Sequence, residues 1–134
     1  MAISFDAALG IHPKALAVRS YRTEILANNL ANSETPGFKA RDLDFRKVLN
    51  DQIDLPNPTE LVQTHQRHRA ISIANSLPDD QLQYRISSQP SIDGNTVDGY
   101  VEQAEFAKNA MQFQASIRFL SSKFKGLLLA IKGQ

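Results

Sequence analysis

The sequence contains no cysteine and no tryptophan among its 134 residues, and aromatic residues make up only 7% of it. Without cysteine, the chain can form neither a disulfide scaffold nor a thiolate zinc site, and it has no cysteine nucleophile. The scarcity of aromatic side chains leaves little of the large apolar surface that usually dominates a compact core. The chain is nevertheless 42% apolar, which excludes the low-hydrophobicity composition of a wholly disordered protein.

Long apolar runs and a strong net charge are missing as well. The longest strictly apolar run, 127–131, is far shorter than the roughly 20 residues that span a bilayer. The first six residues show no basic region followed by an apolar core, so we expect no cleaved secretory signal. The net charge of +1 gives no overall field that would attract nucleic acid or anionic lipid. We therefore expect no membrane span and no nucleic-acid partner, and any export needs another route.

Charge and proline divide the chain into three parts. Residues 1–50 carry a net charge of +2, residues 51–100 carry −4 and residues 101–134 carry +3. Five of the six prolines fall within the acidic middle or just before it, between residues 36 and 90. We predict an N-terminal helix within 1–35, an extended, proline-containing middle segment with short strands over 36–94, and a C-terminal heptad helix within 95–134.

The C-terminal part carries the strongest periodicity. Its apolar residues recur at alternating spacings of four and three, the heptad pattern of a left-handed coiled coil. Asn95 is a candidate N-cap, with Asp98 three residues later, and the lysines near the end suit the helix dipole. We predict a helix from about residue 97 to 132, about 54 Å long. Its seam would be Phe106, Ala110, Phe113, Ile117, Leu120, Phe124, Leu127 and Ile131.

The N-terminal part is also predicted to be helical, with a stripe formed by Val18, Tyr21 and Ile25. Pro13 suits the first turn of a helix, although a start near Ser4 with a kink is an alternative. The type II turn signal of Pro36 and Gly37 stops the helix around residues 32–33. The fold is therefore predicted to be mainly α, with the two terminal helices paired as a coiled coil. Val18, Tyr21 and Ile25 would face the C-terminal seam.

The middle segment gives weaker signals. Residues 43–49 fit either a short strand or one to two helical turns. Residues 70–74 and 83–87 alternate in the manner of short strands. We expect extended chain and small hairpins here.

Some apolar residues cannot be buried by one helix pair. Met111, Phe119, Leu128 and Leu129 point away from the predicted seam. An exposed apolar patch of this kind marks an interaction surface. We expect the chain to complete its core with copies of itself or with relatives, the alternative being an ordinary helix-bundle core.

Motifs for catalysis and metal binding are absent from the sequence. His65 and His68 form the one candidate metal pair, but zinc needs three or four ligands and no carboxylate stands beside them. The sequence has neither a Gly-X-Ser-X-Gly elbow nor a phosphate-binding glycine loop. We predict no enzyme activity, no metal and no cofactor.

The most informative stretch is Ala27-Asn-Asn-Leu-Ala-Asn-Ser-Glu-Thr-Pro-Gly-Phe-Lys39, a helix end with three asparagines before a Pro-Gly turn and an aromatic anchor. It resembles the N-terminal signature of the flagellar rod, hook and hook-filament junction family, the axial proteins of the bacterial flagellum. Residues 40–45, residues 89–98 and the short length are similar to the proximal rod proteins of that family. The residues that carry the signature are Asn28, Asn29, Leu30, Asn32, Thr35, Pro36, Gly37 and Phe38.

This resemblance implies a structural role in the proximal rod of the basal body. Such proteins assemble with other axial proteins into a hollow, torque-transmitting shaft that crosses the periplasm. They are exported by the flagellar type III apparatus without a cleaved signal. The implied partners are copies of the chain itself, the axial proteins FliE, FlgC, FlgF and FlgG, the MS ring and the export gate.

Two other functions remain open on the sequence. A sister rod protein such as FlgC is the nearer alternative, distinguished by residues 89–98. A coiled-coil adaptor unrelated to flagella is the more distant one, and it predicts stable folding in solution without other axial proteins.

Overall fold

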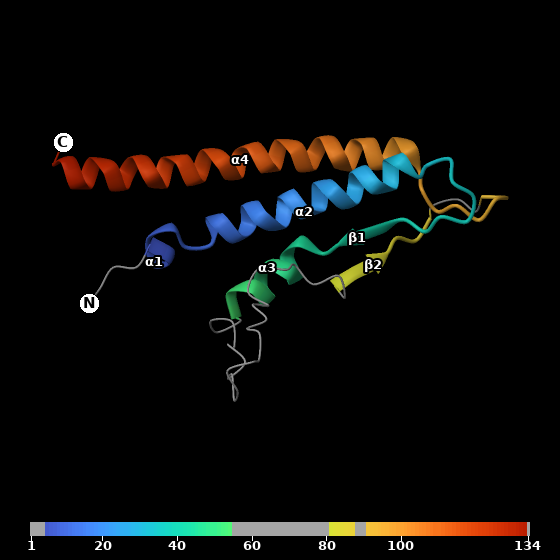
Figure 1. Cartoon of the computed structure of the whole chain (residues 1–134), viewed down its shortest axis with the longest axis horizontal. Helices are drawn as coiled ribbons and strands as arrows, with labels where there is room; N and C mark the ends of the chain where they lie inside the picture. The colour runs from blue at the N-terminus through green and yellow to red at the C-terminus, as the bar shows by residue number, and fades with distance from the viewer. Residues whose placement is uncertain (1–4, 55–80, 88–90, 134) are drawn as a thin grey trace, which may run out of the picture.

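Two long helices, packed side by side, form the body of the molecule (Figure 1). The computed structural model describes residues 5–54, 81–87 and 91–133. Helix α2 (His12–Ala31) runs antiparallel to helix α4 (Gly99–Lys132). The predicted fold, mainly helical with paired terminal helices and a small β element between them, is confirmed.

The N-terminal helical region is divided at Gly10. Helix α1 (Phe5–Leu9) ends there, and Gly10 has a φ of +59°, a left-handed conformation that glycine adopts without steric cost. Pro13 then lies in the first turn of α2, where its missing N–H would have no helical partner. The predicted start near Pro13 is confirmed, and the structure has a break at Gly10 instead of one kinked helix.

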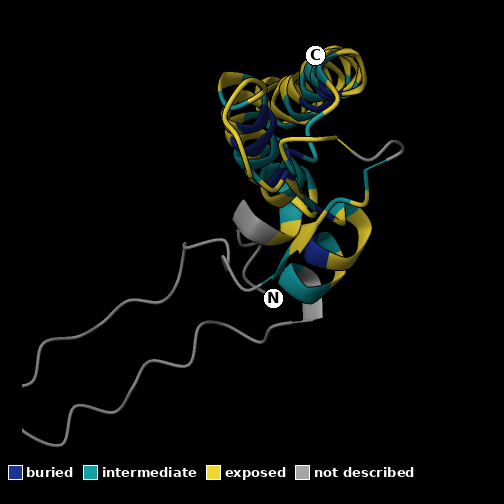
Figure 2. Ribbon diagram, turned by 90° about the vertical axis from the view of Figure 1, so that its right-hand side faces the viewer, coloured by how far each residue is buried: buried dark blue, intermediate teal, exposed yellow. Residues whose placement is uncertain are grey.

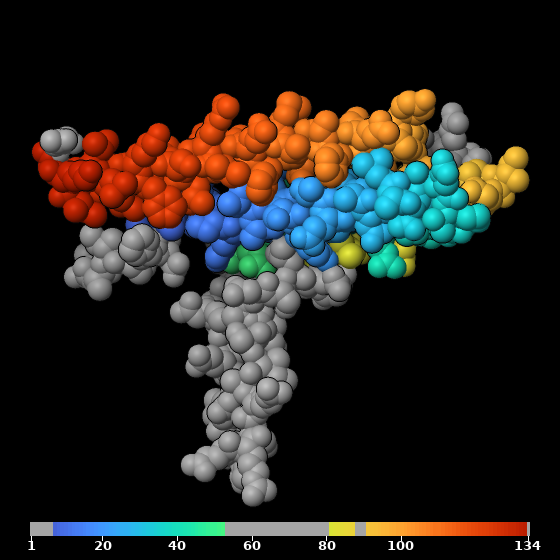
Figure 3. Space-filling model, turned by 45° about the horizontal axis from the view of Figure 1, so that its top comes forward, coloured from blue at the N-terminus to red at the C-terminus, as the bar shows by residue number. Residues whose placement is uncertain are grey.

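Helix α4 is much longer than its partner. Its 34 residues extend about 51 Å, whereas the 20 residues of α2 extend about 30 Å. The C-terminal end of α4 therefore continues past the start of α2 to the region of α1, as Figures 1 and 3 show. The N-cap of α4 is Asp98, whose Oδ1 accepts hydrogen bonds from Tyr100 N and Val101 N at 3.0 and 3.3 Å. The predicted cap at Asn95 is wrong, because that side chain binds the end of α2 instead.

The middle segment contributes a two-stranded antiparallel sheet and a short helix. Strand β1 (Arg41–Leu43) pairs with β2 (Leu82–Tyr84), with Arg41 opposite Tyr84. Helix α3 (Phe45–Asp54) follows β1 directly, so the ambiguous stretch 43–49 begins at the end of a strand and continues as a helix. The strand expected over 83–87 is shorter and begins one residue earlier. The one expected over 70–74 lies outside the described residues.

The apolar core lies between α2 and the middle segment. Val18 and Ile25 of α2 pack with Leu43 of β1 and Val48 of α3, and all four are buried. Tyr21, Phe45 and Leu82 pack against this cluster. In contrast, most of the outer surface of α4 is exposed (Figure 2). Helix α2 therefore makes an apolar contact with the middle segment on one side. On the side that meets α4, its contact includes hydrogen bonds between polar groups.

Candidate assembly surface and the polar contacts that position it

The predicted seam of α4 lies at the edge of its contact with α2, not at the centre. Phe106, Phe113, Leu120 and Leu127 are half-buried, as is Ala110. Ile117 and Phe124 are about two-fifths exposed, and Ile131 is 82% exposed. The buried residues of α4 are Glu102, Asn109 and Ser116, which recur every seven residues. The assignment of the seam residues to an assembly interface stays a prediction. The heptad period is right, but polar side chains occupy its buried positions.

The predicted partner of that seam is corrected. Val18, Tyr21 and Ile25 face β1 and α3 in the apolar core instead of facing α4. The side of α2 toward α4 carries Arg19, Arg22, Leu26 and Asn29, a second stripe at helical spacing. The stripe of Val18, Tyr21 and Ile25 packs against apolar residues of β1 and α3. The weak local pattern of the middle segment does not reveal these residues in the sequence.

Amide and hydroxyl groups join α2 to the middle of α4. Asn109 is fully buried, and its Nδ2 donates to Arg19 O at 3.0 Å and to Thr23 Oγ1 at 2.9 Å. Arg19 Nη1 donates to Gln112 Oε1 at 2.6 Å, while Ser116 Oγ donates to Gln112 O within its own helix. These contacts hold α4 against a polar face of α2.

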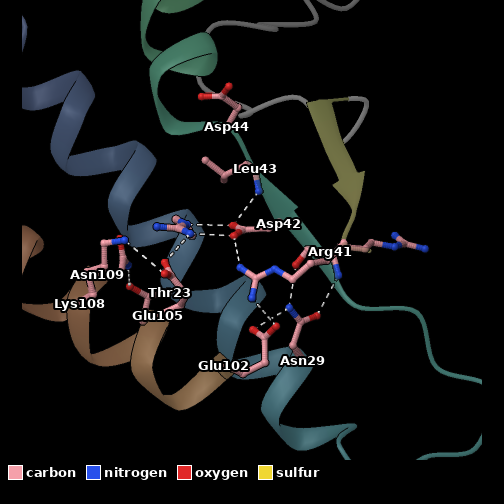
Figure 4. A network of polar contacts seen from close by, with 12 residues as sticks. Thr23, Asn29, Arg41, Asp42, Leu43, Asp44, Glu102, Glu105, Lys108 and Asn109 are labelled. Carbon is pink, nitrogen blue, oxygen red and sulfur yellow. Dashed lines mark hydrogen bonds and ion pairs between the residues drawn. The ribbon is translucent and has the colours of Figure 1, made fainter. Parts of the chain in front are cut away.

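An ionic network continues this contact toward the sheet, with Asp42 of β1 at its centre (Figure 4). Arg22 of α2 binds both oxygens of Asp42, at 2.8 and 2.7 Å, and Arg85 donates to Asp42 Oδ2 as well. Arg22 also contacts Glu105 at 3.1 Å, and Arg85 contacts Glu102 at 2.7 Å. Two guanidinium groups thus bridge three carboxylates from β1 and α4.

The network shifts the protonation of its members. Burial by itself would raise the pKa of Asp42, but the hydrogen bonds and positive charge of Arg22, with smaller contributions from the Leu43 amide and Arg85, lower it below its ordinary value. The hydrogen bond to Asp42 raises the pKa of Arg22. Burial would also raise the pKa of Glu105, yet Lys108 and Arg22 lower it. The charged forms are therefore the ones that the fold favours.

One residue of the asparagine-rich motif links this network to the sheet. Asn29 is 1% exposed, and its amide pairs with the backbone of Arg41, accepting from N at 3.1 Å and donating to O at 2.7 Å. Its Nδ2 also lies 3.2 Å from Glu102 Oε2. Asn29 therefore joins α2, β1 and α4, whereas Asn28 and Asn32 bond to each other at the exposed helix end.

The turn that follows is closed by the segment before α4. Gly37 has a φ of +73°, and Phe38 N donates to Thr35 O, which fits the predicted Pro36–Gly37 turn. Asn95 Nδ2 donates to three carbonyl oxygens of the helix end and turn, those of Asn32, Ser33 and Thr35, at 2.8–3.1 Å. Backbone bonds from Gly37 N to Asp93 O and from Thr96 N to Phe38 O complete the junction. The two segments that resembled the rod family are thus in direct contact.

After Ser116, the last of its buried polar residues, α4 presents mainly apolar and basic side chains to solvent. Shallow grooves run beside α2: one is lined by Thr23, Phe113 and Ile117 among others, and a second by His12, Phe119 and Leu127 among others. Four exposed cations, Arg118, Lys123, Lys125 and Lys132, lie among these residues, and the sequence contains no acidic residue after Glu105. Tyr100 and Val101 are exposed near the start of α4. From Met111 onward the exposed apolar side chains, which lie on several sides of the helix and are together called the exposed strip, are Met111, Ile117, Phe119, Phe124, Leu128, Leu129 and Ile131.

The described residues contain neither a cluster of three metal-ligating side chains nor a membrane-spanning helix. Within 5–54, 81–87 and 91–133 there is no group of three His, Cys, Asp or Glu side chains placed to hold a metal ion. His65 and His68 lie outside these ranges. The helices in the described part of the chain are not long and apolar enough to cross a bilayer.

Known proteins resemble this chain over nearly its whole length. The family described as "Flagella basal body rod protein" matches residues 9–39, which include the asparagine-rich motif. The flagellar basal body rod protein FlgB of Aeromonas hydrophila is 47% identical, covering 100% of this chain and 99% of the relative. FlgB of Escherichia coli K12 is 43% identical over 92% and 91% of the two chains, and that of Salmonella typhimurium 39% identical over 96% and 95%.

The chain belongs to the FlgB family of flagellar basal body rod proteins. As a FlgB-family protein it is a structural component of the bacterial flagellar rod. The three relatives named above are FlgB proteins, and they give no support to the FlgC alternative or to the non-flagellar adaptor.

The polar residues that join the elements of this chain were not predicted from the sequence. A signal was available for Glu102, Asn109 and Ser116, because polar residues at a seven-residue spacing beside an apolar heptad indicate polar layers in a helix contact. The pairing of Arg22, Asp42 and Arg85 had no such signal, since the three residues come from separate elements that only the fold brings together.

Proposed function

We propose that this chain is a subunit of the proximal rod that acts mechanically, without catalysis, and that the exposed strip of α4 is its contact surface with neighbouring axial subunits. The observation that carries the proposal is the exposure of Phe119, Leu128 and Leu129, which are 61%, 54% and 54% exposed. Burying a leucine or phenylalanine side chain yields roughly 1.5–3 kcal/mol. Contacts between subunits would recover this free energy.

The proposed neighbours follow from membership of the axial proteins. They are copies of this chain, the axial proteins FliE, FlgC, FlgF and FlgG, and the MS ring with the export gate at the base. Together the axial proteins would form a hollow shaft across the periplasm that transmits torque, its subunits exported by the flagellar type III apparatus without a cleaved signal. The asparagine-rich turn would fix how the middle segment leaves the helix pair, because Asn29 and Asn95 bind the chain on both sides of it.

Deletion of the gene in its host tests whether this chain is a subunit that the rod needs. Basal bodies purified from the deletion strain and imaged by electron microscopy should show rings without a rod, and a plasmid-borne copy should restore the rod. Intact rods and normal swimming in the deletion strain would overturn the proposal.

A substitution in the exposed strip tests the surface itself. Leu128→Asp places a charge in the proposed contact but not in the buried part of the chain, because Leu128 is more than half exposed. Rod assembly and motility should be lost, while the thermal unfolding of the purified chain stays unchanged. Gln103→Asp, at an exposed polar position of the same helix, is the matched control and should leave swimming normal. Normal swimming of Leu128→Asp would refute the surface assignment.

A further inference from the structure

We propose that the buried polar residues Glu102, Asn109 and Ser116 restrict α4 to pairing with α2 of its own chain and exclude pairing with the α4 helix of a second copy. This pairing preference does not depend on the proposed function. The three residues recur every seven residues on the side of α4 that meets α2.

Polar and apolar layers alternate along this side of α4. Phe106, Phe113 and Leu120 each follow a buried polar residue by four positions. The resulting four-three spacing is that of a coiled-coil seam, in which each residue meets the facing helix. A seam that was apolar at every layer would pair with any similar helix, and a second α4 would be such a helix.

Two of the three polar layers have partners in α2 and beside the sheet, whereas Ser116 donates to Gln112 O of its own helix. Asn109 donates to Thr23 Oγ1 and to Arg19 O, while Glu102 contacts Asn29 and Arg85. A second α4 at the same place would offer neither these amide and hydroxyl groups nor the guanidinium. Without the Arg85 guanidinium, Glu102 would be a buried charge that has lost its partner in such a pair, which penalises that pairing.

Asn109 is poorly explained by stability alone. Its Oδ1 is buried and has no hydrogen-bond partner among the described residues, although its Nδ2 is fully used. A buried carbonyl oxygen without a partner destabilises the fold relative to an apolar side chain of similar size. A single buried asparagine that lowers stability while selecting one pairing is an established device in coiled coils.

The test compares self-association of two variants of the full-length chain by sedimentation equilibrium. The seam variant is Asn109→Leu with Ser116→Leu, which makes two buried layers apolar. The matched control is Gln103→Leu with Ser121→Leu, which adds two leucines to exposed positions of the same helix. Asn109→Ala with Ser116→Ala removes the same polar groups without adding volume, and circular dichroism monitors helix content in all three.

We expect the seam variant to dimerise about tenfold more tightly than the control, which corresponds to about 1.4 kcal/mol. Equal dimerisation of the seam variant and the control would overturn the proposal, because exposed leucines alone would then explain association. If the leucine variant loses its helix content, the test instead compares the dimerisation of the alanine variant with that of the unsubstituted chain, and we expect the alanine variant to dimerise more tightly. An alanine variant that stays as monomeric as that chain would overturn the proposal too.

Discussion

The two halves of α4 meet different surroundings, although one heptad period runs through both. From Asp98 to Ser116 the helix is capped, hydrogen-bonded to α2 and joined to the sheet by ion pairs. From Ile117 to Lys132 it carries exposed apolar and basic side chains, with Leu120 and Leu127 half-buried. The first half therefore carries the polar contacts within the chain, although it also exposes Tyr100, Val101 and Met111, and the second half exposes the larger share of apolar side chains.

The two halves differ in what their side chains achieve: polar side chains fix how the helices align, and apolar side chains gain free energy when they are buried. Hydrogen bonds and ion pairs fix one alignment, because a slip by one heptad moves each polar group about 10 Å from its partner. Apolar side chains favour burial but tolerate several partners. A subunit that must first form its own helix pair and then pack into a larger assembly has reason to use polar contacts for the first step and apolar contacts for the second.

The largest difference is expected between the same substitution at a buried leucine of α2 and at an exposed leucine of α4. Leu26 is fully buried on the α2 stripe that faces α4, so Leu26→Ala should lower the free energy of unfolding by about 3 kcal/mol. Leu128→Ala should change it by less than about 0.5 kcal/mol, because Leu128 is largely exposed in the single chain. Urea unfolding followed by circular dichroism measures both. Equal losses would contradict the difference in burial between Leu26 and Leu128.

Removing the central carboxylate tests the polar half. Asp42→Ala leaves Arg22 without its two-oxygen partner and Arg85 with Glu102 alone, so the free energy of unfolding should fall by about 2 kcal/mol. The control is Glu34→Ala, an exposed carboxylate at the helix end, which should have little effect in the same urea titration. An equally small loss for Asp42→Ala would mean that the network contributes no net stability.

A smaller effect should appear on acidification. The folded chain holds the pKa of Asp42 and Glu105 below their ordinary values of 3.8 and 4.5, so their stabilising contribution is present above those values and is lost as the pH falls through the lower, folded-state pKa values. The urea midpoint should therefore decrease below pH about 4.5. In Asp42→Asn this decrease should be shallower. An identical acid limb in both proteins would exclude Asp42 from the titration.

Local patterns were sufficient for the two long helices and their approximate limits. The heptad spacing and the late lysines predicted α4 to within two residues at its start, and Pro13 with the Pro36–Gly37 turn bounded α2. These features are local, because a turn or a cap depends on a few neighbouring residues. The asparagine-rich motif predicted the family for the same reason, since its residues are contiguous.

Which faces of the helices meet was not predictable in the same way. The stripe of Val18 and Ile25 was assigned to α4, but the structure places it against Leu43 and Val48. Both stripes of α2 have helical spacing, so periodicity alone does not say which neighbour each one contacts. The choice depends on the apolar residues of β1 and α3, which follow in a segment with weak local signals.

Periodicity, composition and the asparagine-rich motif are enough to predict a mainly helical member of the flagellar axial family, with apolar surface beyond what one chain buries. The polar contact between its two long helices becomes evident only in the folded chain. Folding brings Arg22, Asp42, Arg85 and Glu102 from four places in the chain into one ionic network beside that contact. Charges so far apart in sequence acquire partners only when the fold brings them within a few ångströms, and no local pattern encodes that distance.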